Sequence, residues 1–136
     1  MKFLGAPYPI KKTSLGLLPT QNGLNQIKSD LLILLMTNPG ERVMLPEYGT
    51  GLHTLLFEPN DEEITEKARE MIINSINTWE PRVVIKEIDV NIGSSSYSPD
   101  DLHHVLKIRI DFFDQDEIQE VQSLTLNLPL GANNNE

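Results

Sequence analysis

The chain has 136 residues, a net charge of −9, no cysteine and a hydrophobic share of 39%. These values predict one globular domain with a genuine core, and they exclude disulfide bonds and thiolate metal sites. The acidic balance argues against nucleic acid as the main partner, because phosphate binding depends on a basic surface. No apolar run reaches the length that a membrane span requires, and the N-terminal apolar run is too short for a signal peptide. We therefore expect a protein that is made and used in the cytosol, or in something assembled there.

Residues 1–21 are rich in proline, glycine and lysine. Pro7, Pro9 and Pro19 oppose regular helix, so this segment is predicted to be an extended N-terminal arm. We expect residues 22–130 to form a single folded domain. The last six residues, 131–136, read GANNNE and are predicted to be a disordered tail.

Two helices are predicted from apolar residues at helical spacing. The first runs from Asn22 to Met36 and is stopped by Pro39 and Gly40. Residues 41–59 are irregular, with a short helix or turn near Leu52. The second helix has an N-terminal capping pattern in Asn60 and Glu63, and it ends before Pro81. Its apolar stripe is Ile64, Ala68, Met71, Ile72, Ser75, Ile76 and Trp79.

After Pro81 the apolar pattern changes to a period of two, which indicates strands. Leu106, Ile108, Ile110 and Phe112 alternate with charged residues and mark a half-buried strand. Two further strands are expected. The inward residues of one are Val84, Ile88, Val90 and Ile92, with Lys86 as the exception, and those of the other are Leu124, Leu126 and Leu128. Residues 93–101 and 114–120 are the predicted connections, short enough for antiparallel pairing. The expected fold class is α+β, with two main helices packed on a small antiparallel three-stranded sheet.

Motifs for common catalytic chemistry are missing from the sequence. The histidines His53, His103 and His104 have no metal-ligand spacing, and the last two are neighbours on one strand that point to opposite faces. There is no GxSxG elbow and no phosphate-binding loop with its lysine. We therefore predict no catalytic residue, no metal and no cofactor.

One hydrolytic alternative remains open at this point. A glycoside hydrolase needs two carboxyl groups facing each other across a sugar, and a pair such as Glu47 and Glu58 would supply them. With 20 acidic residues, however, such a pair is expected by chance, and the aromatic share of 6% gives little material for a sugar cleft. A peptidoglycan-cleaving, lysozyme-like hydrolase is therefore the second hypothesis.

The most unusual local cluster is Trp79-Glu80-Pro81-Arg82, at the junction of the second helix and the first strand. In one interpretation Glu80 and Arg82 anchor the local backbone of a structural corner. In the other, the corner is a recognition site whose arginine presents a fork of hydrogen-bond donors to a partner. The sequence does not choose between these two interpretations.

Several blocks of residues, in this order, resemble the GpW/gene-25-like family of baseplate wedge proteins. The resemblance covers about residues 16–128. It rests on Phe57-Glu58-Pro59, on Glu80-Pro81-Arg82 and on a segment containing Pro39, Gly40, Glu41, Arg42, Pro46, Glu47, Tyr48 and Gly49. The family commonly has phenylalanine before the last glycine, where this chain has Tyr48, and the strands match in pattern only.

The resemblance implies a structural subunit in the baseplate of a contractile tail, assembled in the host cytoplasm. The implied partners are other baseplate wedge proteins, which form a helical core bundle, and the tail sheath protein, with the central hub or tube as a further candidate. In that family the corner, here Glu80, Pro81 and Arg82, contacts the core bundle, and the sheet serves as a template for the first sheath ring. Exposed strand edges and the arm suit such contacts between chains.

Overall fold

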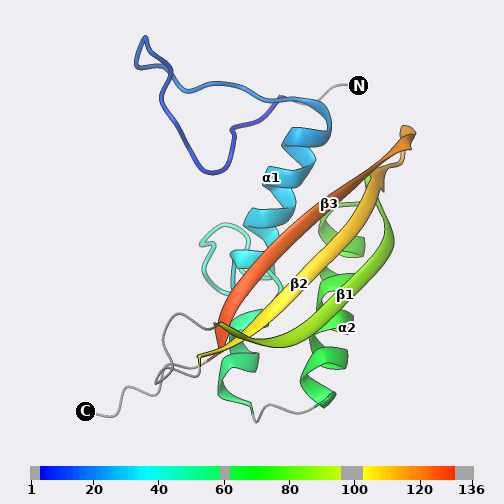
Figure 1. Ribbon diagram of the computed structural model, residues 1–136. Helices are drawn as coiled ribbons and strands as arrows, with labels where there is room; N and C mark the ends of the chain where they lie inside the picture. The colour runs from blue at the N-terminus through cyan, green and yellow to red at the C-terminus, as the bar shows by residue number, and fades with distance from the viewer. Residues whose placement is uncertain (1–3, 59–61, 96–102, 131–136) are drawn as a thin grey trace.

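The computed structural model describes residues 4–58, 62–95 and 103–130. Helix α1 (Gly23–Met36) comes first, followed by a short 3-10 helix η1 (Leu52–Phe57) and helix α2 (Glu62–Trp79) (Figure 1). Three strands follow, β1 (Val83–Ser95), β2 (His103–Asp114) and β3 (Glu117–Leu130). The predicted α+β class, with two main helices and an antiparallel three-stranded sheet, is confirmed.

The strands form one antiparallel sheet in the order β1-β2-β3. Both β1 and β3 are outer strands of this sheet. The connection between β2 and β3 is only Gln115 and Asp116, and the Asp116 N–H donates to Asp114 Oδ1 at 3.1 Å. The prediction that residues 117–120 belong to this connection is therefore wrong, because polar residues continue the ladder where β3 extends past the core. For the same reason β1 continues through residues 93–95, which were also expected in a connection.

A β-bulge at Lys86 changes which side chains of β1 face the core. Ile85 is opposite Phe112 and Glu87 is opposite Asp111, so Lys86 is one residue more than the partner strand supplies. An extra residue shifts the alternation of the strand by one position. Val83 and Ile85 therefore face inward, whereas Val84, predicted to face inward, is 37% exposed.

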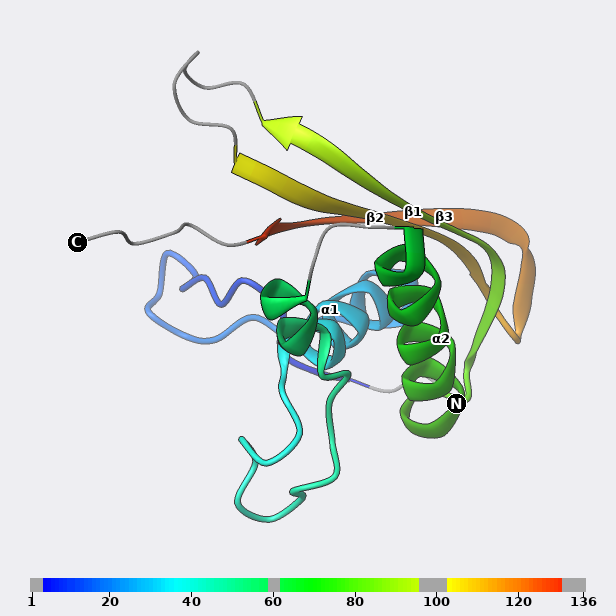
Figure 2. The ribbon, with the colours of Figure 1, turned by 90° about the horizontal axis from the view of Figure 1, so that it is seen from below.

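Both helices cover the same face of the sheet, and the core lies between these two layers (Figure 2). β2 is the central strand and its inward side chains are fully buried. The principal core residues are Leu31, Leu34 and Leu35 of α1, Leu52 and Leu55 of η1, Ile64, Ala68, Ile72 and Ile76 of α2, and Leu106, Ile108, Ile110 and Phe112 of β2.

The helix ends agree closely with the predicted boundaries. Asn22 is the N-cap residue of α1, and α2 ends at Trp79. Ser75, which was placed in the apolar stripe of α2, is half-buried and its hydroxyl donates to the Gly49 carbonyl at 3.2 Å. The predicted capping residue Asn60 lies outside the described residues. None of the helices within 4–58 and 62–95 is long and apolar enough to cross a membrane.

Residues 4–22 form a loop beside the beginning of α1 (Figure 1). Gly5 and Gln21 exchange two backbone hydrogen bonds of 2.9 and 2.8 Å, which close the loop at its base. The Tyr8 N–H donates to the Ser29 hydroxyl of α1 at 3.2 Å. The division into arm, domain and tail stays a prediction, and the tail at 131–136 lies outside the described residues.

Candidate functional site

The junction between α2 and β1 is a tight corner built from local sequence. The Glu80 N–H continues the helical pattern by donating to the Ile76 carbonyl at 2.8 Å. Pro81 has no N–H and occupies the second position of a turn, which the Val83 N–H closes on the Glu80 carbonyl at 3.2 Å. Proline suits this position because its ring fixes the backbone angle that the turn requires. The helix therefore ends where the sequence predicts.

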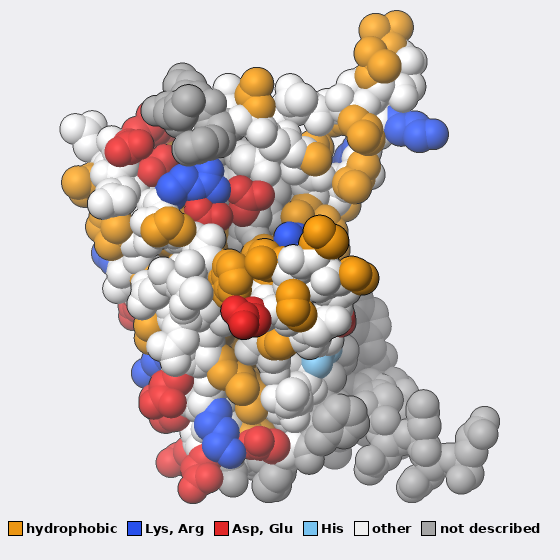
Figure 3. All heavy atoms as spheres, turned by 180° about the vertical axis from the view of Figure 1, so that it is seen from behind, with side chains coloured by type: hydrophobic (Ala, Val, Ile, Leu, Met, Phe, Trp, Pro, Cys, Tyr) orange, Lys and Arg blue, Asp and Glu red, His pale blue; other side chains and the backbone are white. Residues whose placement is uncertain are grey.

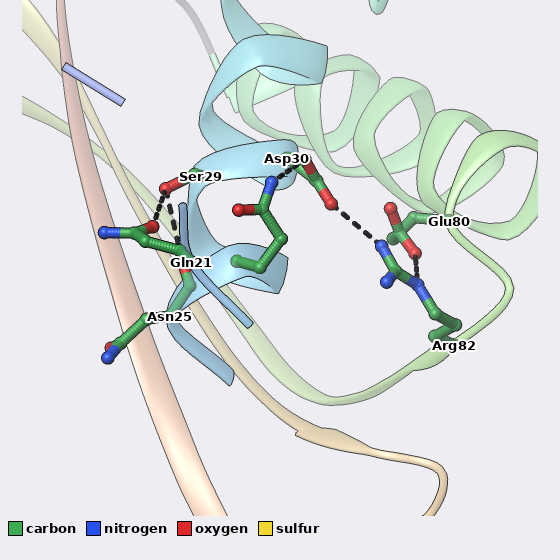
Figure 4. A network of polar contacts seen from close by, with 7 residues as sticks. Gln21, Asn25, Ser29, Asp30, Glu80 and Arg82 are labelled. Atoms are coloured by element: carbon green, nitrogen blue, oxygen red, sulfur yellow. Dashed lines mark hydrogen bonds and ion pairs between the residues drawn. The ribbon is translucent and has the colours of Figure 1, made fainter. Parts of the chain in front are cut away.

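Arg82 connects this corner to α1. Its Nε donates to Glu80 Oε1 at 2.5 Å, and its Nη2 donates to Asp30 Oδ2 at 2.8 Å (Figure 4). Glu80 is only 8% exposed, so its carboxylate depends on this partner for charge compensation. The hydrogen bond to Glu80 is the main cause of a raised pKa for Arg82, which therefore remains a cation. Within the chain itself, Glu80 and Arg82 therefore anchor the corner, as the structural interpretation expects.

Asp30 is the member of this site that sequence reasoning missed. It lies 52 positions before Arg82 and in a helix that was interpreted from its apolar residues. The only indication in the sequence was a carboxylate three positions after Ile27 and four before Leu34, beside the apolar face of that helix. Asp30 also accepts a hydrogen bond of 2.8 Å from Gln26 Nε2, so the ionic contact continues along α1. On the same helix, the hydroxyl of Ser29, the residue before Asp30, donates to Oε1 of Gln21 at 3.1 Å (Figure 4).

A shallow hollow of about 460 Å³ lies against the corner. The arm residue Leu4 and the corner residues Trp79 and Pro81 give it apolar walls. Asp30 and Arg82 also line it. The hollow thus combines apolar area with polar groups that hydrogen bonds hold in place.

The segment from Asn38 to Thr50 packs beside the same corner. The Gly40 N–H donates to the Pro46 carbonyl at 2.6 Å and closes the base of a loop. The Arg42 guanidinium lies 4.0 Å from the centre of the Tyr48 ring, a cation–π contact. The Tyr48 ring in turn meets Trp79 edge to face, with centroids 5.4 Å apart. The chain of contacts Arg42–Tyr48–Trp79 thus joins the loop to the corner.

Gly49 is the residue that allows this close packing. Its φ is +135°, and a Cβ built there would lie 2.4 Å from the Thr37 carbonyl oxygen. No other residue fits both the angle and the space. The next residue, Thr50, is buried and its hydroxyl donates to the Leu35 carbonyl at 2.9 Å. The loop is therefore fixed to the end of α1.

The structure brings together most of the residues singled out in the sequence. Tyr48 lies against Trp79, and burial raises its pKa above the usual value. Glu41 accepts a hydrogen bond of 2.8 Å from the Asn38 side chain. Pro46 and Glu47 lie on the exposed part of the loop, away from the buried contacts. Whether any of these residues contacts a partner stays a prediction.

Carboxyl groups in the described residues are occupied with structural contacts or lie in solvent. Asp30 and Glu80 share Arg82, and Glu58 pairs with Lys67 at 2.8 Å. Within 4–58, 62–95 and 103–130, no three histidine or acidic residues gather so as to hold a metal. Of the candidate glutamates, Glu58 is thus held in an ion pair and Glu47 is exposed on the loop.

The fold and the site define a small α+β protein whose most organised polar feature is a charge-paired corner beside an anchored loop. The sequence of residues 21–116 matches the model of the family described as "Baseplate wedge protein gp25". The chain belongs to this baseplate wedge family. The chain is 31% identical over 101 residues to baseplate wedge protein gp25 of Enterobacteria phage T4, covering 74% of this chain and 73% of the phage protein.

Solved structures share the fold at lower sequence identity. A chain of the anti-feeding prophage baseplate is similar with a TM-score of 0.62 and 20% identity, over 98% of this chain and 90% of that one. A putative tail lysozyme from Geobacter sulfurreducens gives a TM-score of 0.64 and 23% identity, over 79% and 91%. A chain of the pyocin R2 postcontracted baseplate gives 0.53 and 22%, over 95% and 100%. At these identities the likeness concerns the fold.

Proposed function

We propose that this protein is a structural wedge subunit in the baseplate of a contractile tail, assembled in the host cytoplasm, and not an enzyme. The observation that carries the proposal is the meeting of two distant sequence blocks in one surface. The Arg42–Tyr48 contact belongs to one block and the Trp79–Arg82 corner to the other. Family membership supplies the assembly in which such a surface has a use.

The corner is the proposed contact with a helical core bundle of neighbouring wedge proteins. Two donor groups of Arg82 are already engaged with Glu80 and Asp30. The arginine therefore acts first by fixing the shape of the corner, and the hollow beside it offers a rigid surface for a partner. Preorganised surfaces bind with a smaller entropy cost.

The sheet is the proposed contact with the tail sheath. β1 and β3 are outer strands, and the backbone groups along an outer strand are able to pair with a strand from another chain. Such pairing imposes a strict geometry, which suits a template for the first sheath ring. The central hub or tube is a further candidate partner.

The test is tail assembly in cells that produce all other tail proteins. Pro81→Lys is the informative variant, because Pro81 is exposed and a turn of this kind accepts most residues at that position. We expect a folded protein and at least tenfold fewer assembled tails. Arg82→Ala, examined in parallel, should also stop assembly. Normal assembly with both variants would contradict the proposed role of the corner.

The hydrolase alternative has weaker support. Of its carboxylate candidates, Glu47 lies on an exposed loop, and Glu58 forms an ion pair with Lys67. The likeness to a putative tail lysozyme is at 23% identity and concerns the fold. Clearing of a cell-wall suspension by the purified protein, lost in Glu47→Gln, would establish this alternative.

A further inference from the structure

The loop between α1 and η1 carries an apolar tip consisting of Val43, Met44 and Leu45. Val43 and Met44 are each 93% exposed, and Leu45 is 39% exposed. The loop projects away from the sheet (Figure 2), and hydrophobic side chains gather on the face that Figure 3 shows. Adjacent, almost fully exposed aliphatic side chains are unfavourable in water and mark contact sites when they occur together.

The apolar tip is held in a fixed conformation. Its base is closed by the hydrogen bond from Gly40 to Pro46. Within the tip, the Leu45 N–H donates to the Arg42 carbonyl at 3.2 Å, and the Tyr48 N–H donates to the Leu45 carbonyl at 3.1 Å. These bonds order the backbone before any partner arrives, so binding would cost little additional conformational entropy.

We propose that the apolar tip inserts into an apolar groove on a different protein of the baseplate, and that basic side chains border this groove. This inference rests on the proposed function and extends the contact beyond the corner. The tip projects from the surface, so its partner must be concave. Glu41 and Glu47 flank it as exposed acids, whereas the neighbouring Arg42 cation lies over the Tyr48 ring. The two carboxylates outnumber the one cation, so charge complementarity favours basic groups around the groove.

The position of the tip connects it to the corner. Tyr48 lies between Arg42, next to the tip, and Trp79, next to the corner. One partner surface is thus able to meet both features. A contact through the tip alone would be too small for stable association, because a specific interface buries about 800 Å² on each partner. This size argues against a second copy joined tip to tip.

A lipid surface is a poorer occupant for the same electrostatic reason. The chain carries a net charge of −9, and the two acids near the tip, Glu41 and Glu47, outnumber its one neighbouring cation, Arg42. Anionic membrane surfaces attract basic segments and repel acidic ones. The described features thus favour a protein groove.

The first experiment changes polarity at the tip while keeping its shape. In Val43→Thr/Met44→Gln both side chains keep about the same size and gain polar groups, and because both are exposed the fold should be unaffected. We expect at least tenfold fewer assembled tails in the complementation assay. The matched control Val43→Ile/Met44→Leu keeps the tip apolar and should assemble within twofold of wild type.

The second experiment identifies what covers the tip. The chain has no cysteine, so Met44→Cys introduces a single thiol that accepts a benzophenone photocrosslinker. Irradiation of assembled tails should join this position to a different baseplate protein, read by mass spectrometry. A crosslink only to a second copy, no crosslink to protein, or pelleting of the purified protein with phosphatidylglycerol vesicles would overturn the inference.

The two proposals fail in distinguishable ways. If Pro81→Lys stops assembly while Val43→Thr/Met44→Gln assembles normally, the corner is a contact and the inference about the tip is wrong. If these two variants and Arg82→Ala all assemble normally, the tip inference and the proposed role of the corner are both wrong.

Discussion

The Nη2 atom of Arg82 lies 2.8 Å from Oδ2 of Asp30, although 52 positions separate these residues in the chain. This contact joins the turn between α2 and β1 to the middle of α1 through side chains that are each 30% exposed. The same guanidinium holds the buried Glu80 carboxylate. A motif that appears local in the sequence is therefore part of the tertiary structure.

Arg82→Ala should lower the free energy of unfolding by about 1–3 kcal/mol, because it leaves the Glu80 carboxylate buried without its cation. Urea unfolding followed by circular dichroism measures this change. Arg109→Ala is the matched control, since Arg109 pairs with Asp111 while 59% exposed, and its loss should cost below about 1 kcal/mol. Equal effects of the two substitutions would contradict the structural role of Arg82.

Gly49→Ala should destabilise the protein by more than about 2 kcal/mol. The added Cβ would meet the Thr37 carbonyl oxygen at 2.4 Å, and the φ of +135° is unfavourable for alanine. Gly40→Ala provides the comparison, because Gly40 also has positive φ, +92°, but has open space around its Cβ position. We expect about 1 kcal/mol there, measured by thermal unfolding. A cost at Gly49 no larger than at Gly40 would mean that the contact with Thr37 does not restrict the loop.

Tyr48 should make stability depend on alkaline pH. Burial raises its pKa in the folded protein above the ordinary value of 10.0. Once the pH exceeds this ordinary value, the unfolded chain loses the phenol proton before the folded chain does, so ionisation favours unfolding. Stability should fall as pH rises from 10.0 through the folded pKa, and this fall should be smaller in Tyr48→Phe. Tyr8→Phe, at a residue 39% exposed, is the control for urea unfolding at a series of pH values.

Deleting Lys86 should be tolerated, because it is the extra residue of the bulge. Without it Val83 and Ile85 still face inward, and the ladder becomes regular. We expect a loss of no more than about 1 kcal/mol. Deleting Asp89, an exposed residue in the regular part of β1, turns Val83 and Ile85 outward if the bulge remains. If the bulge is lost instead, Glu87 takes the inward place of Ile88, so either outcome should unfold the chain. Circular dichroism and size-exclusion chromatography distinguish these outcomes. Two equally folded variants would show that the bulge does not determine which β1 side chains face the core.

Local patterns in the sequence determine the element types. The spacing of Leu31, Leu34 and Leu35 predicts α1, and the alternation from Leu106 to Phe112 predicts the central strand. Both patterns are visible because each element buries one continuous face against the core. Pro81 marks the end of α2 for an equally local reason, its missing N–H and fixed φ.

Only the tertiary structure decided the phase of β1 and the partners of the corner. The Lys86 bulge depends on pairing with β2, so alternation alone misplaced Val84. Asp30 reaches Arg82 only when the two helices pack together, and no local pattern encodes a contact across 52 positions. Periodicity along the chain reports which residues avoid water, whereas charge pairing and strand register depend on distances between segments, which exist only after folding.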